Sequence, residues 1–82
     1  MNFDFQSQPL TSLRPGATAR VTGVHGGRGM VIRLAHMGIR PGATVRLVNR
    51  GPWRGPLLVE VDGMRVALGR GVARHVLVRP VA

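Results

Sequence analysis

Several short stretches of this chain alternate apolar and polar residues, and this period of two is typical of half-buried β-strands. The alternation is bounded by glycine and proline, and it predicts five strands at residues 18–24, 44–49, 57–61, 64–68 and 75–79. In each strand one face is apolar enough to lie against a core, while the other face is mostly polar.

Between the first two predicted strands, the hydrophobic period changes to that of a helix. Apolar residues within 30–37 recur at intervals of three and four, so we expect a short amphipathic helix there. Gly38 is expected to end it, because glycine commonly stands just past a helix C-terminus. The basic residues expected on the opposite, polar face are Arg33, His36 and Arg40.

Turn-forming pairs separate these elements. Proline presets φ for the second residue of a turn, and glycine accepts the positive φ that a type II turn needs at the third. Pro15-Gly16 and Pro41-Gly42 are such pairs, and both lie in the same five-residue sequence, RPGAT. We interpret the copies as one turn used at two corners rather than as a duplicated unit. Asp62-Gly63 joins two alternating runs and is a strong β-hairpin signal.

The predicted elements favour an all-β fold. Five short strands leave vulnerable edges unless the sheet closes on itself, so we expect a small SH3-like β-barrel. One short α-helix is inserted after the first long strand, and single helical turns are expected at residues 10–13 and 69–74. Residues 1–9 precede any periodic pattern and are expected to form a flexible lead-in to a domain spanning residues 10–80.

Composition narrows the function classes. The chain has 82 residues, no cysteine and a formal net charge of +9. Its length suits one domain, and the absence of cysteine excludes disulfides and thiolate metal sites. All 12 basic residues are arginines, spread without a block of like charge, so the charge does not by itself indicate specific nucleic-acid binding. The chain contains neither a secretory signal nor an apolar run of roughly 18 residues, so we expect a cytoplasmic protein without membrane insertion.

The sequence contains no arrangement of residues typical of an active site. Glu60 and Asp62 share a strand face and could pair, but the turn explains Asp62 and arginines are available to Glu60. No Ser or Thr lies in a nucleophile motif, and residues 25–29 lack the spacing of a phosphate-binding loop. We therefore expect that the protein is not an enzyme.

Three histidines, His25, His36 and His75, are the candidate metal ligands. They are expected to be exposed, in a loop, on the polar helix face and at an outward strand position. Their spacing is not that of a ligand pair, and solvated side chains are the simpler interpretation. Exposed imidazoles can also bind a transition ion such as Fe²⁺ or Zn²⁺ between two molecules, which leaves a homodimer open. No cofactor is expected to be required.

Trp53 lies in a loop stiffened by two prolines and is followed by Arg54. A tryptophan in a stiff loop loses little entropy on binding, so it suits an anchor for a protein partner. The alternative is that Trp53 folds back over one end of the barrel.

The order of motifs also resembles a known family. The helix exit reads Arg33-Leu-Ala-His-Met-Gly-Ile-Arg-Pro-Gly-Ala-Thr-Val45, followed by a Gly-Pro loop, Val59-Glu-Val-Asp-Gly63 and Ala67-Leu-Gly-Arg70. Each motif alone is mostly turn chemistry, but together they resemble the FeoA family over about residues 9–80. The loop at 51–56 departs from the family pattern, because Trp and Arg stand where smaller or less charged residues are common.

The resemblance implies an SH3-like barrel and a small cytoplasmic accessory protein of bacterial ferrous iron uptake. The implied partner is FeoB, a membrane transporter with a cytoplasmic GTP-binding domain. The candidate partner-binding residues are Arg33, His36, Arg40, Trp53 and Arg54. A similar domain forms the C-terminal part of metal-dependent repressors of the DtxR type. The alternative function is therefore that of a transition-metal-binding or nucleic-acid-binding module. Since no helix-turn-helix precedes the barrel in this sequence, we expect the free-standing accessory protein.

Overall fold

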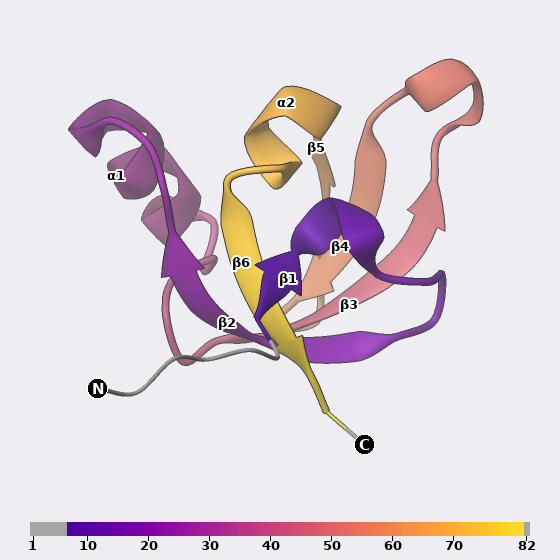
Figure 1. Cartoon of the computed structure of the whole chain (residues 1–82), viewed down its shortest axis with the longest axis horizontal. Helices are drawn as coiled ribbons and strands as arrows, with labels where there is room; N and C mark the ends of the chain where they lie inside the picture. Colours follow the sequence, from indigo (N-terminus) through magenta and orange to yellow (C-terminus); the bar gives the residue numbers. More distant parts are fainter. Residues whose placement is uncertain (1–6, 82) are drawn as a thin grey trace.

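The computed structural model describes residues 7–81 of the chain (Figure 1). The strands are β1 (Gln8–Pro9), β2 (Thr18–Val24), β3 (Thr44–Arg50), β4 (Leu57–Val61), β5 (Met64–Leu68) and β6 (Val76–Pro80). The helical segments are α1 (Arg28–His36), α2 (Arg70–Ala73), η1 (Leu10–Ser12) and η2 (Pro52–Arg54). The five predicted strands, the helix and both predicted helical turns are therefore present.

All six strands belong to one antiparallel sheet in the order β1-β6-β2-β3-β4-β5. The sheet is strongly curved (Figure 1). Register shifts between Val21 and Gly23 and between Leu47 and Asn49 mark irregularities of the kind that bend a strand. Within residues 7–81 the edge strands β1 and β5 do not pair, so the sheet is open and the word barrel fits it only loosely.

Strand β1 adds to the predicted architecture. Residues 1–9 were expected to form a lead-in; residues 1–6 lie outside the described part of the chain, but Gln8–Pro9 pairs with residues 77–78 of β6. The hydroxyl groups of Ser7 and Thr22 also share a hydrogen bond of 2.8 Å. The sheet thus has a sixth strand, which the prediction of five missed because alternation cannot be recognised in two residues.

Fifteen buried side chains, all of them apolar, form the core. They are Leu10, Leu13, Ala19, Val21, Leu34, Ile39, Val45, Leu47, Leu57, Val59, Val61, Leu68, Ala73, Val76 and Val78. No polar side chain in the described part of the chain is buried. In β4, burial alternates along the strand in agreement with the period of two in the sequence.

The two RPGAT copies form equivalent corners. Gly16 and Gly42 have φ values of 90° and 95°, as a type II turn requires at its third position. The Gly16 N–H donates to the Leu47 carbonyl at 2.6 Å, and the Gly42 N–H donates to the Val21 carbonyl at 2.8 Å. The first corner leads into β2 and is hydrogen-bonded to β3. The second corner leads into β3 and is hydrogen-bonded to β2. The Asp62-Gly63 turn is also confirmed, with φ values of 51° and 77°.

Helix α1 begins at Arg28 instead of at residue 30, so the predicted break over residues 25–29 is too long. Its C-terminus is as expected, because Gly38 has a φ of 87°. The Ile39 N–H donates to the Leu34 carbonyl at 2.9 Å, which closes a Schellman motif. Both of these residues are buried, so the end of the helix is fixed against the core.

Candidate functional site

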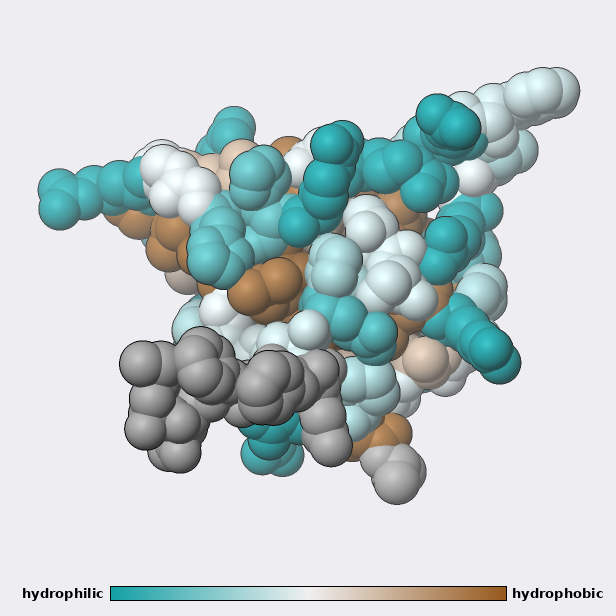
Figure 2. All heavy atoms as spheres, in the orientation of Figure 1, coloured by the Kyte–Doolittle hydropathy of each residue, from teal (hydrophilic) through white to brown (hydrophobic). Residues whose placement is uncertain are grey.

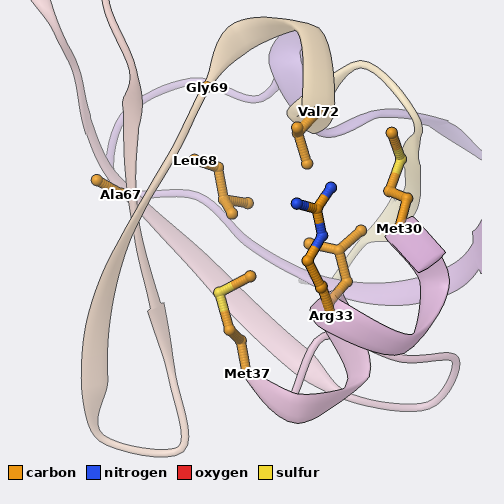
Figure 3. Close-up of a pocket in the computed structure, with 8 residues that line it drawn as sticks. Met30, Arg33, Met37, Ala67, Leu68, Gly69 and Val72 are labelled. Atoms are coloured by element: carbon orange, nitrogen blue, oxygen red, sulfur yellow. The ribbon is translucent and has the colours of Figure 1, made fainter.

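An open groove lies between α1 on one side and the end of β5 with α2 on the other (Figure 3). The lining residues are Met30, Arg33, Leu34, Met37, Ala67, Leu68, Gly69 and Val72. The groove encloses about 210 Å³. Small-molecule pockets typically measure about 300–1,000 Å³, so this volume suits a few side chains of a partner better than a drug-sized ligand.

Three residues of α1 and its C-cap residue line the groove at the helical spacing i, i+3, i+4 and i+7: Met30, Arg33, Leu34 and Met37. Arg33 therefore lies on the groove side of α1, which corrects its predicted place on the opposite face. Figure 3 shows its guanidinium reaching across the groove towards Val72 of α2. A mostly apolar groove with one cationic side chain at its mouth can accept an apolar side chain beside an acidic one.

Neither acidic residue of the described part of the chain lines the groove. Glu60 pairs with Arg46 at 3.2 Å and lies 3.9 Å from Arg65. Asp62 is part of the hairpin turn. Within residues 7–81 no carboxylate pairs with Arg33, so its charge is available to a partner.

The β3–β4 loop, residues 51–56, holds Trp53 away from the core. Trp53 is 97% exposed, which excludes the alternative that it covers one end of the sheet. Trp53 and Arg54 both have a φ of 59°, so η2 is a tight turn and not a regular helix. Holding a non-glycine residue in this left-handed backbone conformation costs on the order of 1 kcal/mol or more. Backbone strain of this kind is found especially at binding sites.

The same loop is closed by its backbone. The Gly51 N–H donates to the Pro56 carbonyl and the Gly55 N–H donates to the Pro52 carbonyl, both at 2.9 Å. A Cβ atom at Gly51 would lie 2.7 Å from the Pro56 carbonyl oxygen, so only glycine fits this crossing. The loop is a rigid projection that presents Trp53 to solvent.

Helix α2 lies between the groove and this loop. Val72 of α2 lines the groove, while Arg70 Nε donates to the Arg54 carbonyl at 3.3 Å. In Figure 1, α1, α2 and η2 occupy the same end of the molecule. We call the groove together with Trp53 and Arg54 the docking face.

The other predicted partner-binding residues lie outside the groove. His36 and Arg40 are exposed, at the end of α1 and at the second RPGAT corner. Figure 2 shows hydrophilic side chains scattered over the visible face, with apolar atoms between them. The hydrophilic side chains on this face are therefore not gathered into one block.

The structure brings two of the three histidines together. The His25 N–H donates to the His75 carbonyl at 2.8 Å, so their backbones are adjacent. His36, on α1, does not join them: no cluster of three or more metal-ligating side chains occurs in residues 7–81. His75 was expected at an outward position within the last strand. It lies just before that strand, because β6 begins at Val76.

The β5–α2 wall of the groove was missed in the sequence. Its residues, 67–69 and Val72, lie about 30 positions from α1 along the chain. The sequence did contain one signal, because Met37 extends the apolar face of α1 beyond the end of the helix. In the structure its side chain remains 39% exposed. An exposed methionine at the end of an amphipathic face is a reason to look for an unfilled groove.

A curved antiparallel sheet with one short helix packed at its open end defines a small SH3-like domain. Residues 8–80 match the FeoA domain family. The chain is 30% identical over 70 residues to a proposed Fe(2+) transport protein A of Methanocaldococcus jannaschii. The aligned region covers 85% of this chain and 83% of that protein. The chain therefore belongs to the FeoA family, as its motifs indicate.

Solved structures agree with this assignment. The crystal structure of an iron uptake regulatory protein, FeoA, is similar with a TM-score of 0.85 at 36% identity, covering 92% of this chain and 99% of that one. A manganese-dependent transcriptional repressor is similar with a TM-score of 0.83 at 25% identity, but the match covers only 42% of its chain. Among the described residues, no helix is both long and apolar enough to cross a membrane.

Proposed function

We propose that the protein is a cytoplasmic accessory protein of ferrous iron uptake that binds the cytoplasmic part of a FeoB-type transporter. Its membership of the FeoA family supports the link to iron transport. The observation that carries the docking proposal is the open groove with Arg33 at its mouth. The protein acts by binding and not by catalysis.

The docking face suggests how a partner segment is held. An apolar side chain of the partner enters the groove against Leu68 and Val72, and burying a side chain of this kind contributes about 1.5–3 kcal/mol. A carboxylate beside it pairs with Arg33. Trp53 then contacts a second patch of the partner, where a rigid, exposed tryptophan is typical of a binding hot spot.

A direct binding measurement tests this proposal. The cytoplasmic domain of the transporter is titrated with the full chain, with and without guanine nucleotide, at low and at moderate salt. We expect saturable one-to-one binding that persists at moderate salt, because groove contacts are apolar and little screened. An absence of binding under all four conditions would contradict the proposal.

Nucleic-acid binding is the second candidate, because the chain carries a net charge of +9 and is similar to part of a transcriptional repressor. It predicts retention on DNA or RNA at low salt and a steep loss of affinity as salt rises. A lack of retention at low salt rejects it. The described part of the chain contains one aromatic side chain, Trp53, which is poorly suited to stacking on successive bases.

A further inference from the structure

His25 and His75 lie directly opposite each other at one end of the sheet. Val24 of β2 pairs with Val76 of β6, and the next position along the ladder places His25 opposite His75. Their backbone hydrogen bond of 2.8 Å confirms this pairing. Directly opposite residues of an antiparallel pair lie about 5 Å apart, with their side chains on the same face.

Burial of the neighbouring pair in the ladder, Val24 and Val76, indicates which way the imidazoles point. Val76 is buried and Val24 is half-buried, so the strand alternation turns the following pair outwards. His25 and His75 are both exposed, in agreement with this geometry. Glycines follow His25 at positions 26 and 27, so neither of these positions carries a side chain that would crowd the imidazoles.

We propose that His25 and His75 together bind one divalent transition ion, each through one ring nitrogen. Zn–N bonds of about 2.0–2.1 Å place two ligand nitrogens roughly 3.3 Å apart in a tetrahedral site, which imidazoles on opposite residues can reach. Imidazole suits Zn²⁺, Ni²⁺, Cu²⁺ and Fe²⁺, whereas Mg²⁺ and Ca²⁺ prefer oxygen ligands. Water fills the remaining coordination positions.

The expected affinity is modest. Two protein ligands leave half of a tetrahedral site to solvent, and structural zinc sites normally supply four. Arg28 and Arg74 are close to the pair in sequence, and both are exposed cations that oppose the charge of the ion. An ion bound this way exchanges readily, unlike a permanent structural metal.

The position of the pair links it to the docking face, in a step that rests on the proposed function. His25 precedes α1, which begins at Arg28, and His75 follows α2, which ends at Ala73. A bound ion therefore ties the start of one groove helix to the end of the other. It limits how far the two walls separate and should make partner binding sensitive to the metal.

Isothermal titration of the full metal-free chain with ZnCl₂ tests the site without any transporter. We expect one ion per chain, and a loss of affinity of about tenfold or more in His25→Ala and in His75→Ala, because each change removes one arm of a chelate. His36→Ala is the matched control, since it removes an exposed histidine outside the pair. Binding should be unchanged in this variant, and MgCl₂ should give no heat of binding.

Two results would overturn the proposal. One is Zn²⁺ affinity that survives in either pair variant, and the other is an equal loss in His36→Ala. Circular dichroism and thermal melting of each metal-free variant check that the fold is intact, which is expected because all three histidines are exposed. If the chain binds Zn²⁺ through His25 and His75 but does not bind the transporter, the metal site is supported. Only the proposed effect of the ion on partner binding is then contradicted.

Discussion

The groove and the Trp53 loop lie on the same docking face but are built in different ways. The groove is shaped by tertiary packing, because Leu34 and Leu68 belong both to its lining and to the buried core. The loop has no buried residue in η2 and is shaped by two backbone hydrogen bonds and by glycine and proline. Changes in the groove should therefore affect folding and binding together, whereas changes at Trp53 should separate them.

The largest effect is expected from Leu34→Asp, which would break the groove and the core at once. Leu34 is 1% exposed, so the new carboxylate would be buried without a partner. Such substitutions cost more than about 4 kcal/mol, which is most of the stability of a small domain. Thermal melting followed by circular dichroism should show no cooperative transition. His36→Ala, in the same helix but exposed, should melt as the wild type does; equal melting temperatures for the two variants would contradict the assigned helix face.

A smaller effect is expected from Gly51→Ala, which tests whether the loop is fixed by its backbone. The added Cβ would lie 2.7 Å from the Pro56 carbonyl oxygen, so the crossing of the loop must open. We expect a loss of about 1–3 kcal/mol, measured by urea unfolding, with the core intact. The companion change Gly71→Ala, in α2 where nothing lies within 4 Å of the new Cβ, should not destabilise the fold. Similar losses in both variants would show that the close approach at Gly51 is unimportant.

The smallest effect on stability is expected from Trp53→Ala. With 97% of Trp53 exposed, the free energy of unfolding should change by no more than about 0.5 kcal/mol. Binding to the transporter domain should weaken by about 2 kcal/mol if Trp53 is an anchor. Since the chain has one tryptophan, its fluorescence should report a water-exposed indole when free and shift to the blue on binding. A substantial loss of stability would show that Trp53 packs on the domain instead.

The sequence predicted the parts of the fold that depend on local pattern. Alternation located β2 to β6, and the φ requirements of Gly16, Gly38 and Gly42 located three chain reversals. The start of α1 was missed because glycine costs about 1 kcal/mol in a helix, so Gly29 argued against a helix that tertiary packing stabilises.

The candidate site was only partly predictable, because it depends on contacts between distant segments. Arg33 and Trp53 were proposed from their own surroundings in the chain, with Arg33 expected on the wrong face of α1, but α2 and the end of β5 reach the groove only through the fold. The His25–His75 pairing likewise follows from the β2–β6 register, which no pattern within either strand encodes. Residue types and the hydrophobic period predict where helices and strands lie along the chain. How these elements pack and pair determines which side chains come into contact.

One measurement tests the central claim most directly, which is that the groove with Arg33 at its mouth binds the transporter. The affinity of the cytoplasmic transporter domain is measured for the wild type, for Arg33→Glu and for Arg14→Glu, which makes the same change of charge at the first RPGAT corner, outside the groove. We expect Arg33→Glu to weaken binding at least about tenfold, because a carboxylate at the groove mouth repels the acidic partner group. Arg14→Glu should bind within about twofold of the wild type, a margin that screening of exposed charges allows. Equal affinities for the two variants would contradict the account.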